Sequence, residues 1–209
     1  MPDPGRIVIL NGAPRAGKSS IVAAIQAGFE GVWMNLGVDL WVQATPPAFR
    51  PGLGLRPGGE RPDLEPLVAV SYAALYESVA AHSRLGLNVV IDVGHHDPAV
   101  LADCARRLSG LPVLFVGVRC PIETIMARRN AGADGLYAKG TAEEPVPAPV
   151  RRWQDGVHRP GIYDLEVDTS TMSPSACAEA IGRLLKEGIP APTAFERLSW
   201  KPHAPEETS

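Results

Sequence analysis

The chain has 209 residues, of which 45% are hydrophobic and 21% charged, and these values fit one globular domain with a sizeable core. The formal net charge of −3 and the isoelectric point near 6.0 argue against a protein that binds nucleic acid through bulk charge. We expect a cytoplasmic protein, because no apolar run is long enough to span a membrane, the first residues lack the pattern of a signal peptide, and Cys104, Cys120 and Cys177 show no disulfide or zinc spacing.

The first predicted strand, Ile7–Leu10, leads into a loop with the spacing of a phosphate-binding site. The loop reads Gly12, Ala13, Pro14, Arg15, Ala16, Gly17, Lys18 and Ser19, and Ser20 continues into a helix predicted over residues 18–27. Glycines let the backbone approach a polyphosphate, and the N–H groups of the loop and helix point at it. Lys18 can reach the β- and γ-phosphates, and the Ser19 hydroxyl can ligate Mg²⁺. The sequence predicts a nucleoside triphosphate site here; the alternative is a glycine turn with an exposed lysine and a serine N-cap.

Further strands and helices alternate along the chain. We predict strands over residues 32–36, 88–92, 113–118 and 163–167, and helices over residues 68–84, 98–108, 121–130 and 173–185. Asp97 and Ser173 are expected to cap two of these helices. Nearly continuous apolar strands separated by helices are typical of a parallel sheet covered on both faces, so the predicted fold class is α/β.

Two stretches interrupt this alternation. Residues 45–66 are rich in glycine and proline, and residues 131–149 are irregular and lead to a short helix. Long irregular loops in a small domain are usually functional or disordered. We expect the first loop to line an acceptor pocket, and a lid over residues 128–159 to close over the nucleotide. One domain is predicted over residues 1–189, followed by an irregular tail over residues 190–209.

Two carboxylates follow predicted strands, at the sheet edge where ligands of open α/β folds bind. Asp92 ends an apolar strand, which is the form of a Walker-B carboxylate that holds Mg²⁺ through water; the alternative is a cap of a strand-end turn. Asp39 follows the second strand and could accept the proton of an attacking hydroxyl. From spacing alone, Asp39 could also be the N-cap of a helix running through Trp41.

Four arginines are candidates for neutralising the charge of a transferring phosphoryl group. Arg128 and Arg129 lie late in the helix after the fourth strand, and Arg151 and Arg152 follow the irregular segment. The alternative for each pair is that its side chains simply face water. For Arg128 and Arg129, positive charge near a helix C-terminus also interacts favourably with the helix dipole.

Aromatic residues and histidines give a less specific signal. A ring-bearing substrate could meet an aromatic wall made from Trp33, Trp41, Phe49 and Trp153, although core packing is the alternative for each of them. A lone histidine is usually not catalytic, so His95, His96 and His158 are only secondary candidates.

Five segments of the chain resemble chloramphenicol phosphotransferase and its relatives. They are Ile9–Gly12, Leu36–Asp39, Val89–Asp92, Val116–Cys120, and Val157-His158 with Tyr163–Thr169. The resemblance implies a P-loop NTPase of the kinase type, a three-layer α/β/α fold with a five-stranded parallel sheet. It implies transfer of the γ-phosphate of ATP to a hydroxyl of a small molecule, which in chloramphenicol phosphotransferase is the 3′-hydroxyl of the drug. Asp39 matches the family's proposed general base, and Lys18 and Ser19 match its phosphate-loop residues.

One departure from the family pattern concerns the lid. Relatives typically carry a Gly-Asp-Arg segment after the fourth-strand helix, and residues 130–135 lack its arginine. We assign Arg128 to the reaction centre and Arg129 to the bound nucleotide as its replacements, with Arg151 and Arg152 as alternatives.

The sequence therefore predicts an ATP- and Mg²⁺-dependent O-phosphotransferase, with a chloramphenicol-like antibiotic as the first choice of acceptor. The alternative is a kinase for a nucleoside, a sugar or a nucleotide-sugar. A nucleotide-hydrolysing switch is disfavoured, since the chain has no Asn-Lys-x-Asp guanine reader. The expected partner is a small-molecule hydroxyl acceptor and neither nucleic acid nor membrane, while a homo-oligomer is left open.

Overall fold

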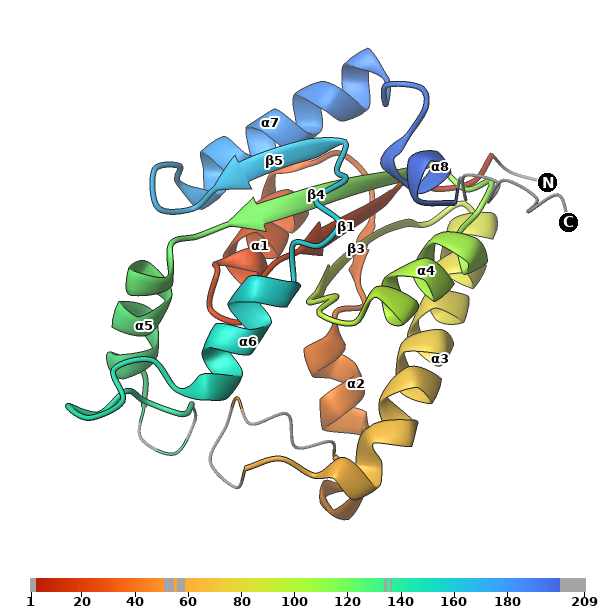
Figure 1. The fold of residues 1–209 in the computed structure, drawn as a ribbon. Coiled ribbons are helices and arrows are strands. Elements are labelled where there is room, and N and C mark those ends of the chain that lie inside the picture. The colour runs from red at the N-terminus through yellow and green to blue at the C-terminus, as the bar shows by residue number, and fades with distance from the viewer. Residues whose placement is uncertain (1–2, 51–54, 56–58, 134, 136, 200–209) are drawn as a thin grey trace, which may run out of the picture.

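The computed structural model describes residues 3–50, 55, 59–133, 135 and 137–199, and their centre is a five-stranded parallel sheet (Figure 1). Its strands are β1 (Ile7–Asn11), β2 (Trp33–Asn35), β3 (Asn88–Val93), β4 (Val113–Arg119) and β5 (Leu165–Asp168), in the order β2-β3-β1-β4-β5. Leu10 of β1 lies opposite Asp92 of β3 and Val116 of β4. The loop that follows β1 therefore leaves the middle of the sheet with a neighbouring strand end on each side.

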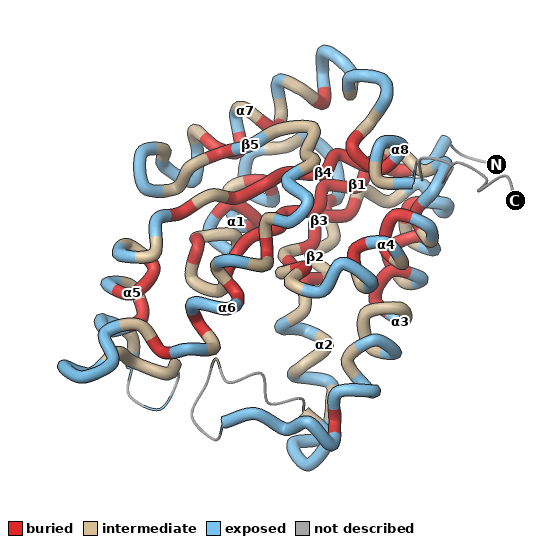
Figure 2. Tube along the Cα trace, in the orientation of Figure 1, coloured by how far each residue is buried: buried red, intermediate tan, exposed pale blue. Residues whose placement is uncertain are grey.

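Helices cover both faces of the sheet. They are α1 (Lys18–Gly28), α2 (Val38–Ala44), α3 (Glu65–Arg84), α4 (Pro98–Arg107), α5 (Ile122–Asn130), α6 (Ala148–Gly156), α7 (Pro174–Glu187) and α8 (Ala194–Ser199). Successive side chains of a strand point to opposite faces. Val8 and Leu10 thus belong to a core shared with α1 and α7, and Ile7 and Ile9 to a core shared with α3, α4 and α8. Figure 2 shows the central strands buried between these layers. The predicted three-layer α/β/α architecture with a five-stranded parallel sheet is confirmed.

Local signals in the sequence placed several helix starts correctly. The Asp97 side chain accepts a hydrogen bond from the backbone of Ala99 at 2.8 Å, and Ser173 accepts one from the backbone of Ala176 at 3.2 Å. These two N-caps are confirmed. All three cysteines are buried and free. Among the described residues, no helix has both the length and the apolar character that a membrane span needs.

The first part of the predicted irregular tail is helical. Ala194 and Phe195 of α8 are buried, and the Phe195 ring lies 5.3 Å from that of Phe115 on β4. Asp164 joins the two elements, because its carboxylate accepts hydrogen bonds from the backbones of Phe115 and Ala194. The prediction of an irregular tail is therefore wrong for α8, since burial of an aromatic ring overrides the local prolines. Residues 200–209 lie outside the described residues.

The glycine- and proline-rich loop contains two short 3₁₀ turns, at Pro47–Phe49 and Pro62–Leu64. Helix α3 begins directly after the second turn, three residues before its predicted start. The prediction that this loop lines a pocket falls partly on residues 51–54 and 56–58, which lie outside the described residues.

Candidate active site

The phosphate loop joins β1 to α1 in a conformation that few residue types adopt. Gly17 has a φ of 95° and Arg15 a φ of 74°, both in the left-handed region. This conformation is easy for glycine and costs about 1–2 kcal/mol for other residues. Two hydrogen bonds hold Arg15 there: its Nη2 donates to the Arg128 carbonyl at 3.0 Å, and Arg128 Nη1 donates to the Arg15 carbonyl at 3.2 Å. Helix α5 thus fixes the shape of the loop.

Lys18 turns its side chain back over the loop. Its Nζ donates to the carbonyls of Gly12 at 2.8 Å and Ala13 at 3.0 Å. Burial lowers the pKa of Lys18 to about 8, and the carboxylates of Asp92 and Asp39 oppose that shift. The three charged groups therefore lie close enough to influence one another. The alternative of a glycine turn with an exposed lysine is wrong, because this side chain is half-buried and bonded to the loop.

Ser19 and Asp92 form a direct pair. The Ser19 hydroxyl donates to Asp92 Oδ2 at 2.7 Å. A Cβ at Gly37 would overlap the other carboxylate oxygen of Asp92, so glycine at this position makes room for the pair. A hydroxyl and a carboxylate are hard oxygen ligands, and Mg²⁺ typically takes one or two of these from a protein together with water and phosphate oxygens. The donor set fits Mg²⁺.

Asp39 lies in the first turn of α2, the helix that follows the edge strand β2. Gly37 is the N-cap of this helix, so the alternative that made Asp39 the N-cap is wrong. The Asp39 side chain is exposed, and its charge acts on Lys18. Figure 1 shows α2 beyond the carboxyl end of the sheet.

The two arginines of α5 have different contacts. Arg128 donates from Nη2 to the Thr169 carbonyl at 2.9 Å and from Nη1 to the Thr169 hydroxyl at 3.2 Å. Arg129 is fully buried, and it donates to the carbonyls of Ala138 and Leu55 at 3.0 and 2.7 Å. The alternative of a solvated face is wrong for both. Arg128 joins the phosphate loop to the end of β5, and Arg129 joins the predicted lid to the loop before α3.

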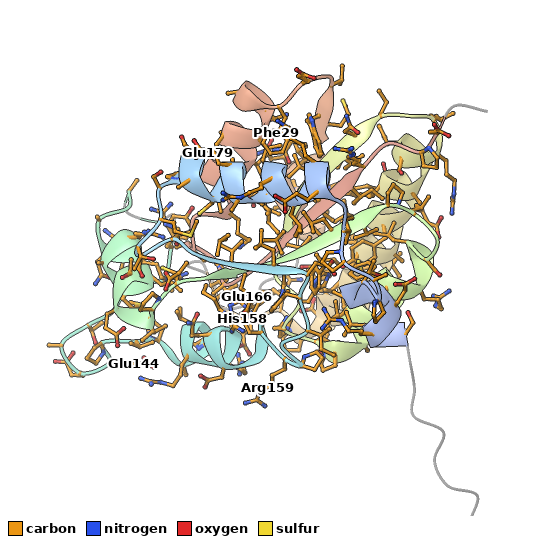
Figure 3. The ribbon with its side chains drawn as sticks, turned by 90° about the horizontal axis from the view of Figure 1, so that it is seen from above. Phe29, Glu144, His158, Arg159, Glu166 and Glu179 are labelled. Carbon is orange, nitrogen blue, oxygen red and sulfur yellow. The ribbon has the colours of Figure 1, made fainter. Side chains whose placement is uncertain are left out.

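The second arginine pair, Arg151 and Arg152, lies on a solvent-exposed face, as its alternative interpretation predicted. Arg151 and Arg152 are exposed, and Arg152 forms an ion pair with Glu60. Figure 3 shows Arg159, after the end of α6, pointing outward from the molecule. Among the described residues, no hydrogen bond joins any of these three side chains to the phosphate loop.

A cavity of about 580 Å³ lies beside the carboxyl end of β3. Its wall comes from the short loop before α3, α3, the β3–α4 connection, α4 and α6: Glu60, Arg61, Pro62, Glu65, Pro66, Val68, Ala69, Tyr72, Gly94, His95, His96, Asp97, Val100, Arg152 and Trp153. The rings of His96 and Trp153 are stacked, with centroids 4.1 Å apart. A Cβ at Gly94 would come within 2.6 Å of Trp153, so this glycine admits the indole.

Of the four aromatic residues proposed for a wall, Trp153 takes that place. Trp33 packs against Phe29 in the core, with ring centroids 5.4 Å apart. Trp41 packs against the core of the opposite face, and Phe49 is 55% exposed. The spacing of aromatic residues in a sequence cannot separate these outcomes, because contacts with distant segments decide them.

Sequence reasoning missed the support that Asn11 gives to this edge. Its Nδ2 donates to the Val157 carbonyl and to the Tyr163 hydroxyl, both at 2.8 Å, and its Oδ1 accepts from the His95 backbone at 2.8 Å. The Tyr163 hydroxyl also bonds His158 Nδ1 at 2.8 Å. The sequence signal for this role is a polar residue at the end of an apolar strand, because such a residue needs hydrogen-bond partners once it is buried.

The burial of His158 fixes its charge. Its pKa is lowered to about 4, first by burial and then by the positive charges of Arg119 and Lys18. The ring is therefore neutral at physiological pH. His158 serves as a hydrogen-bonding partner of Tyr163 in this arrangement.

Comparison with known proteins agrees with this geometry. The family model described as "Chloramphenicol phosphotransferase-like protein" matches residues 5–186. The chain is 28% identical over 214 aligned positions to the "Putative O-phosphotransferase Rv2636" of Mycobacterium tuberculosis, covering 95% of this chain and 89% of that protein.

Two solved structures share the fold. An unliganded sugar kinase from Janibacter superposes with a TM-score of 0.62 at 17% identity, covering 95% of this chain and 100% of that chain. The APS kinase CysC of Mycobacterium tuberculosis, in complex with AMPPNP and APS, superposes with a TM-score of 0.58 at 14% identity, covering 88% of this chain and 99% of that chain. At these identities the likeness concerns the fold alone.

Proposed function

The chain belongs to the chloramphenicol phosphotransferase-like family of kinase-like phosphotransferases, and on that premise we propose that it transfers the γ-phosphate of ATP to a hydroxyl of a small organic molecule. The observation that carries the proposal is the meeting of Lys18, the Ser19–Asp92 pair and Asp39 at one edge of the sheet. Phosphoryl transfer needs a held triphosphate, a divalent cation and a group that takes the acceptor's proton. These residues supply one part each.

The nucleotide side holds and orients the triphosphate. The loop N–H groups and the start of α1 bind phosphate oxygens. Lys18 exchanges its contacts with the Gly12 and Ala13 carbonyls for contacts with phosphate. Ser19 and Asp92 would hold Mg²⁺, and the bound cation would neutralise phosphate charge.

The acceptor side supplies the proton acceptor. Asp39 takes the hydroxyl proton as the acceptor oxygen bonds to the γ-phosphorus and the bond between that phosphorus and the β,γ-bridging oxygen breaks. ADP leaves with the electron pair of the broken bond, and the proton on Asp39 passes to solvent.

The arginines act around this centre. The contacts of Arg128 with Arg15 and Thr169 support a role in positioning the phosphate loop, with its charge close to the transferring group. Arg129 anchors the lid over residues 128–159 to the loop before α3. A closed lid excludes water and suppresses hydrolysis of ATP.

A chloramphenicol-like antibiotic is the acceptor we propose first. The cavity beside β3 has the volume of a site for a drug-sized molecule, and the stacked rings of His96 and Trp153 form one wall. A nucleoside, a sugar or a nucleotide-sugar is the alternative acceptor within the same reaction.

The test is a ³¹P NMR screen with ATP and Mg²⁺ against chloramphenicol, nucleosides, sugars and nucleotide-sugars. A new phosphomonoester signal is expected with one class. Asp39→Asn should lower kcat by about 10²–10⁴-fold, which is the usual contribution of a general base. Glu179→Gln, which neutralises an exposed carboxylate on α7, is the matched control (Figure 3). Transfer by Asp39→Asn at the wild-type rate would overturn the base assignment, and phosphate going only to water across the panel would overturn the kinase.

A further inference from the structure

The side chain of Tyr137 packs against two arginines that belong to different parts of the chain. Arg15 is in the phosphate loop, and its guanidinium carbon lies 4.8 Å from the centre of the Tyr137 ring. Arg129 is in α5, and its guanidinium carbon lies 5.6 Å from the same centre. A guanidinium over the face of an aromatic ring, within about 6 Å of its centre, is attracted to that ring. Tyr137 therefore connects the phosphate loop to α5, in addition to the hydrogen bonds between Arg15 and Arg128.

The Tyr137 ring also packs closely against the end of α5. The side chain is half-buried. A Cβ at Gly132 would come within 3.3 Å of the ring and within 3.2 Å of the Arg129 carbonyl oxygen, so glycine at this position leaves room for the ring. The direction of the ring is thus set by the helix end as well as by the two guanidinium groups.

Arg129 extends this connection to the loop before α3. It donates from Nη2 to the Leu55 carbonyl at 2.7 Å and from Nε to the Ala138 carbonyl at 3.0 Å. The Ala138 backbone N–H donates to the same Leu55 carbonyl at 3.2 Å. Glu60, further along the loop that contains Leu55, forms part of the wall of the cavity beside β3. The phosphate loop and this cavity wall are therefore joined through Tyr137 and Arg129.

Arg15 and Arg129 are two like charges that are close enough to repel each other. Burial holds the pKa of Arg129 below its ordinary value, Tyr137 opposes that shift, and the charge of Arg15 adds to it. In the described part of the chain, no ion pair joins either arginine to a carboxylate. A triphosphate on the phosphate loop brings negative charge to Arg15 and offsets the repulsion. Nucleotide binding therefore favours the arrangement in which both guanidinium groups lie against Tyr137.

We propose that Tyr137 is a positioning residue that couples the nucleotide site to the cavity beside β3, by holding Arg15 and Arg129 against one ring. A triphosphate on the phosphate loop stabilises this group, and Arg129 then holds Leu55 and Ala138 together more firmly. This inference rests on the proposed function, because it needs a nucleotide on the phosphate loop. Coupling between sites is reciprocal, so an acceptor in the cavity binds the nucleotide complex more tightly than the free protein.

The test measures hydrogen exchange at the Ala138 amide, because its hydrogen bond to Leu55 reports directly on the connection. Exchange is followed by NMR in the full chain, with and without Mg²⁺ and AMPPCP, an ATP analogue with a methylene between the β- and γ-phosphorus atoms. In the wild type, saturating AMPPCP should slow exchange at Ala138 by about tenfold, which lies within the usual range of coupling between two sites. Unchanged exchange at Ala138 in the AMPPCP complex would overturn the proposal.

Three variants locate the effect. Tyr137→Phe keeps the ring face and should keep the slowing. Tyr137→Leu removes the ring, and Arg15→Met removes the guanidinium of the phosphate loop, so at saturating AMPPCP neither should slow exchange at Ala138. Exchange at the Ala176 amide, which the Ser173 side chain caps in α7, is the internal control for folding and should stay as in the wild type. Slowing that survives in folded Tyr137→Leu or Arg15→Met would refute the role of the ring, and so would its loss in Tyr137→Phe.

Phosphate transfer is then measured separately by ³¹P NMR with ATP and Mg²⁺. A wild type whose Ala138 exchange responds to AMPPCP, but which phosphorylates no alcohol, retains the coupling and refutes the proposed function. A wild type that phosphorylates an alcohol without this response retains the function and refutes the coupling. Failure of AMPPCP to bind at all would refute both.

Discussion

The nucleotide side and the acceptor side of this edge are built in different ways. The phosphate loop is one continuous segment, Gly12–Ser19, whose backbone we propose as the main binding surface, and α5 supports it through Arg128. The cavity where we propose that the acceptor binds draws its wall from three separate stretches of chain, within residues 60–72, 94–100 and 152–153, and its character comes from side-chain rings such as Trp153 and His96. A site that binds its ligand through main-chain N–H groups tolerates substitution of most of its side chains. A site that binds through side chains can change its ligand preference with a single substitution. Substitutions on the two sides should therefore separate nucleotide effects from acceptor effects.

The largest effect is expected on the nucleotide side, from Lys18→Met. The variant removes the charge that stabilises the transferring phosphoryl group, and kcat/KM should fall by about 10³-fold or more. The measurement is ADP release coupled to phosphomonoester formation. Lys186→Met, an exposed lysine in the last turn of α7, is the matched control and should behave as wild type. A loss of less than tenfold in Lys18→Met would contradict the assigned role.

The next effect concerns the cation. Asp92→Asn and Ser19→Ala should each raise the Mg²⁺ concentration needed for half-maximal transfer by about 10–100-fold, as loss of a metal-orienting partner usually does. Transfer is measured as a function of Mg²⁺ at saturating ATP. Because the two side chains are hydrogen-bonded, their effects should not add in the double variant. Strict additivity would indicate that they act independently.

A smaller effect should be confined to the acceptor side. Trp153→Leu removes one face of the stacked pair, and the KM for the acceptor should rise by about tenfold, since a stacked aromatic contact and its buried area are worth about 1–2 kcal/mol. The KM for ATP should stay within about twofold. Steady-state kinetics, with the acceptor and ATP varied in turn, measures the two KM values separately. A rise in the KM for ATP would show that the two sides are not separable.

The smallest effect is on stability, at His158, which lies between the two sides. Its pKa is about 4 in the folded protein, and the unfolded value is about 6.5. Between these pH values the unfolded chain binds a proton that the folded chain does not, so the free energy of unfolding falls as the pH drops through this window. The slope for one proton is at most about 1.4 kcal/mol per pH unit. Urea denaturation from pH 7 to pH 4 should show a flatter curve for His158→Gln, and identical slopes would contradict the burial of a neutral ring.

The residues that the sequence predicted well are those whose environment is local. The phosphate loop, the N-caps at Asp97 and Ser173 and the alternation of strands and helices follow from short patterns. The placement of Ser19 and Asp92 at the same edge of the sheet followed from a general rule, because parallel strands end at one edge. These predictions needed no knowledge of packing between distant segments.

The residues that the sequence predicted poorly depend on contacts between distant segments. Arg129 was assigned to the bound nucleotide, with a solvated helix end as the alternative, and is instead fully buried and bonded to the carbonyls of Leu55 and Ala138. Residues 194–199 looked irregular and form α8, because Phe195 packs on Phe115. His95 gave no specific signal, and its unpaired Nδ1 appears only once Tyr76 occupies the other ring nitrogen.

The sequence by itself predicted an α/β fold with a phosphate loop, since the spacing of that loop between a strand and a helix is a local pattern. Only the tertiary structure decided which of several aromatic residues, histidines and arginines are buried, line the cavity or lie on the exposed surface. A side chain's environment is set by what packs against it from elsewhere in the chain, and no local pattern records that.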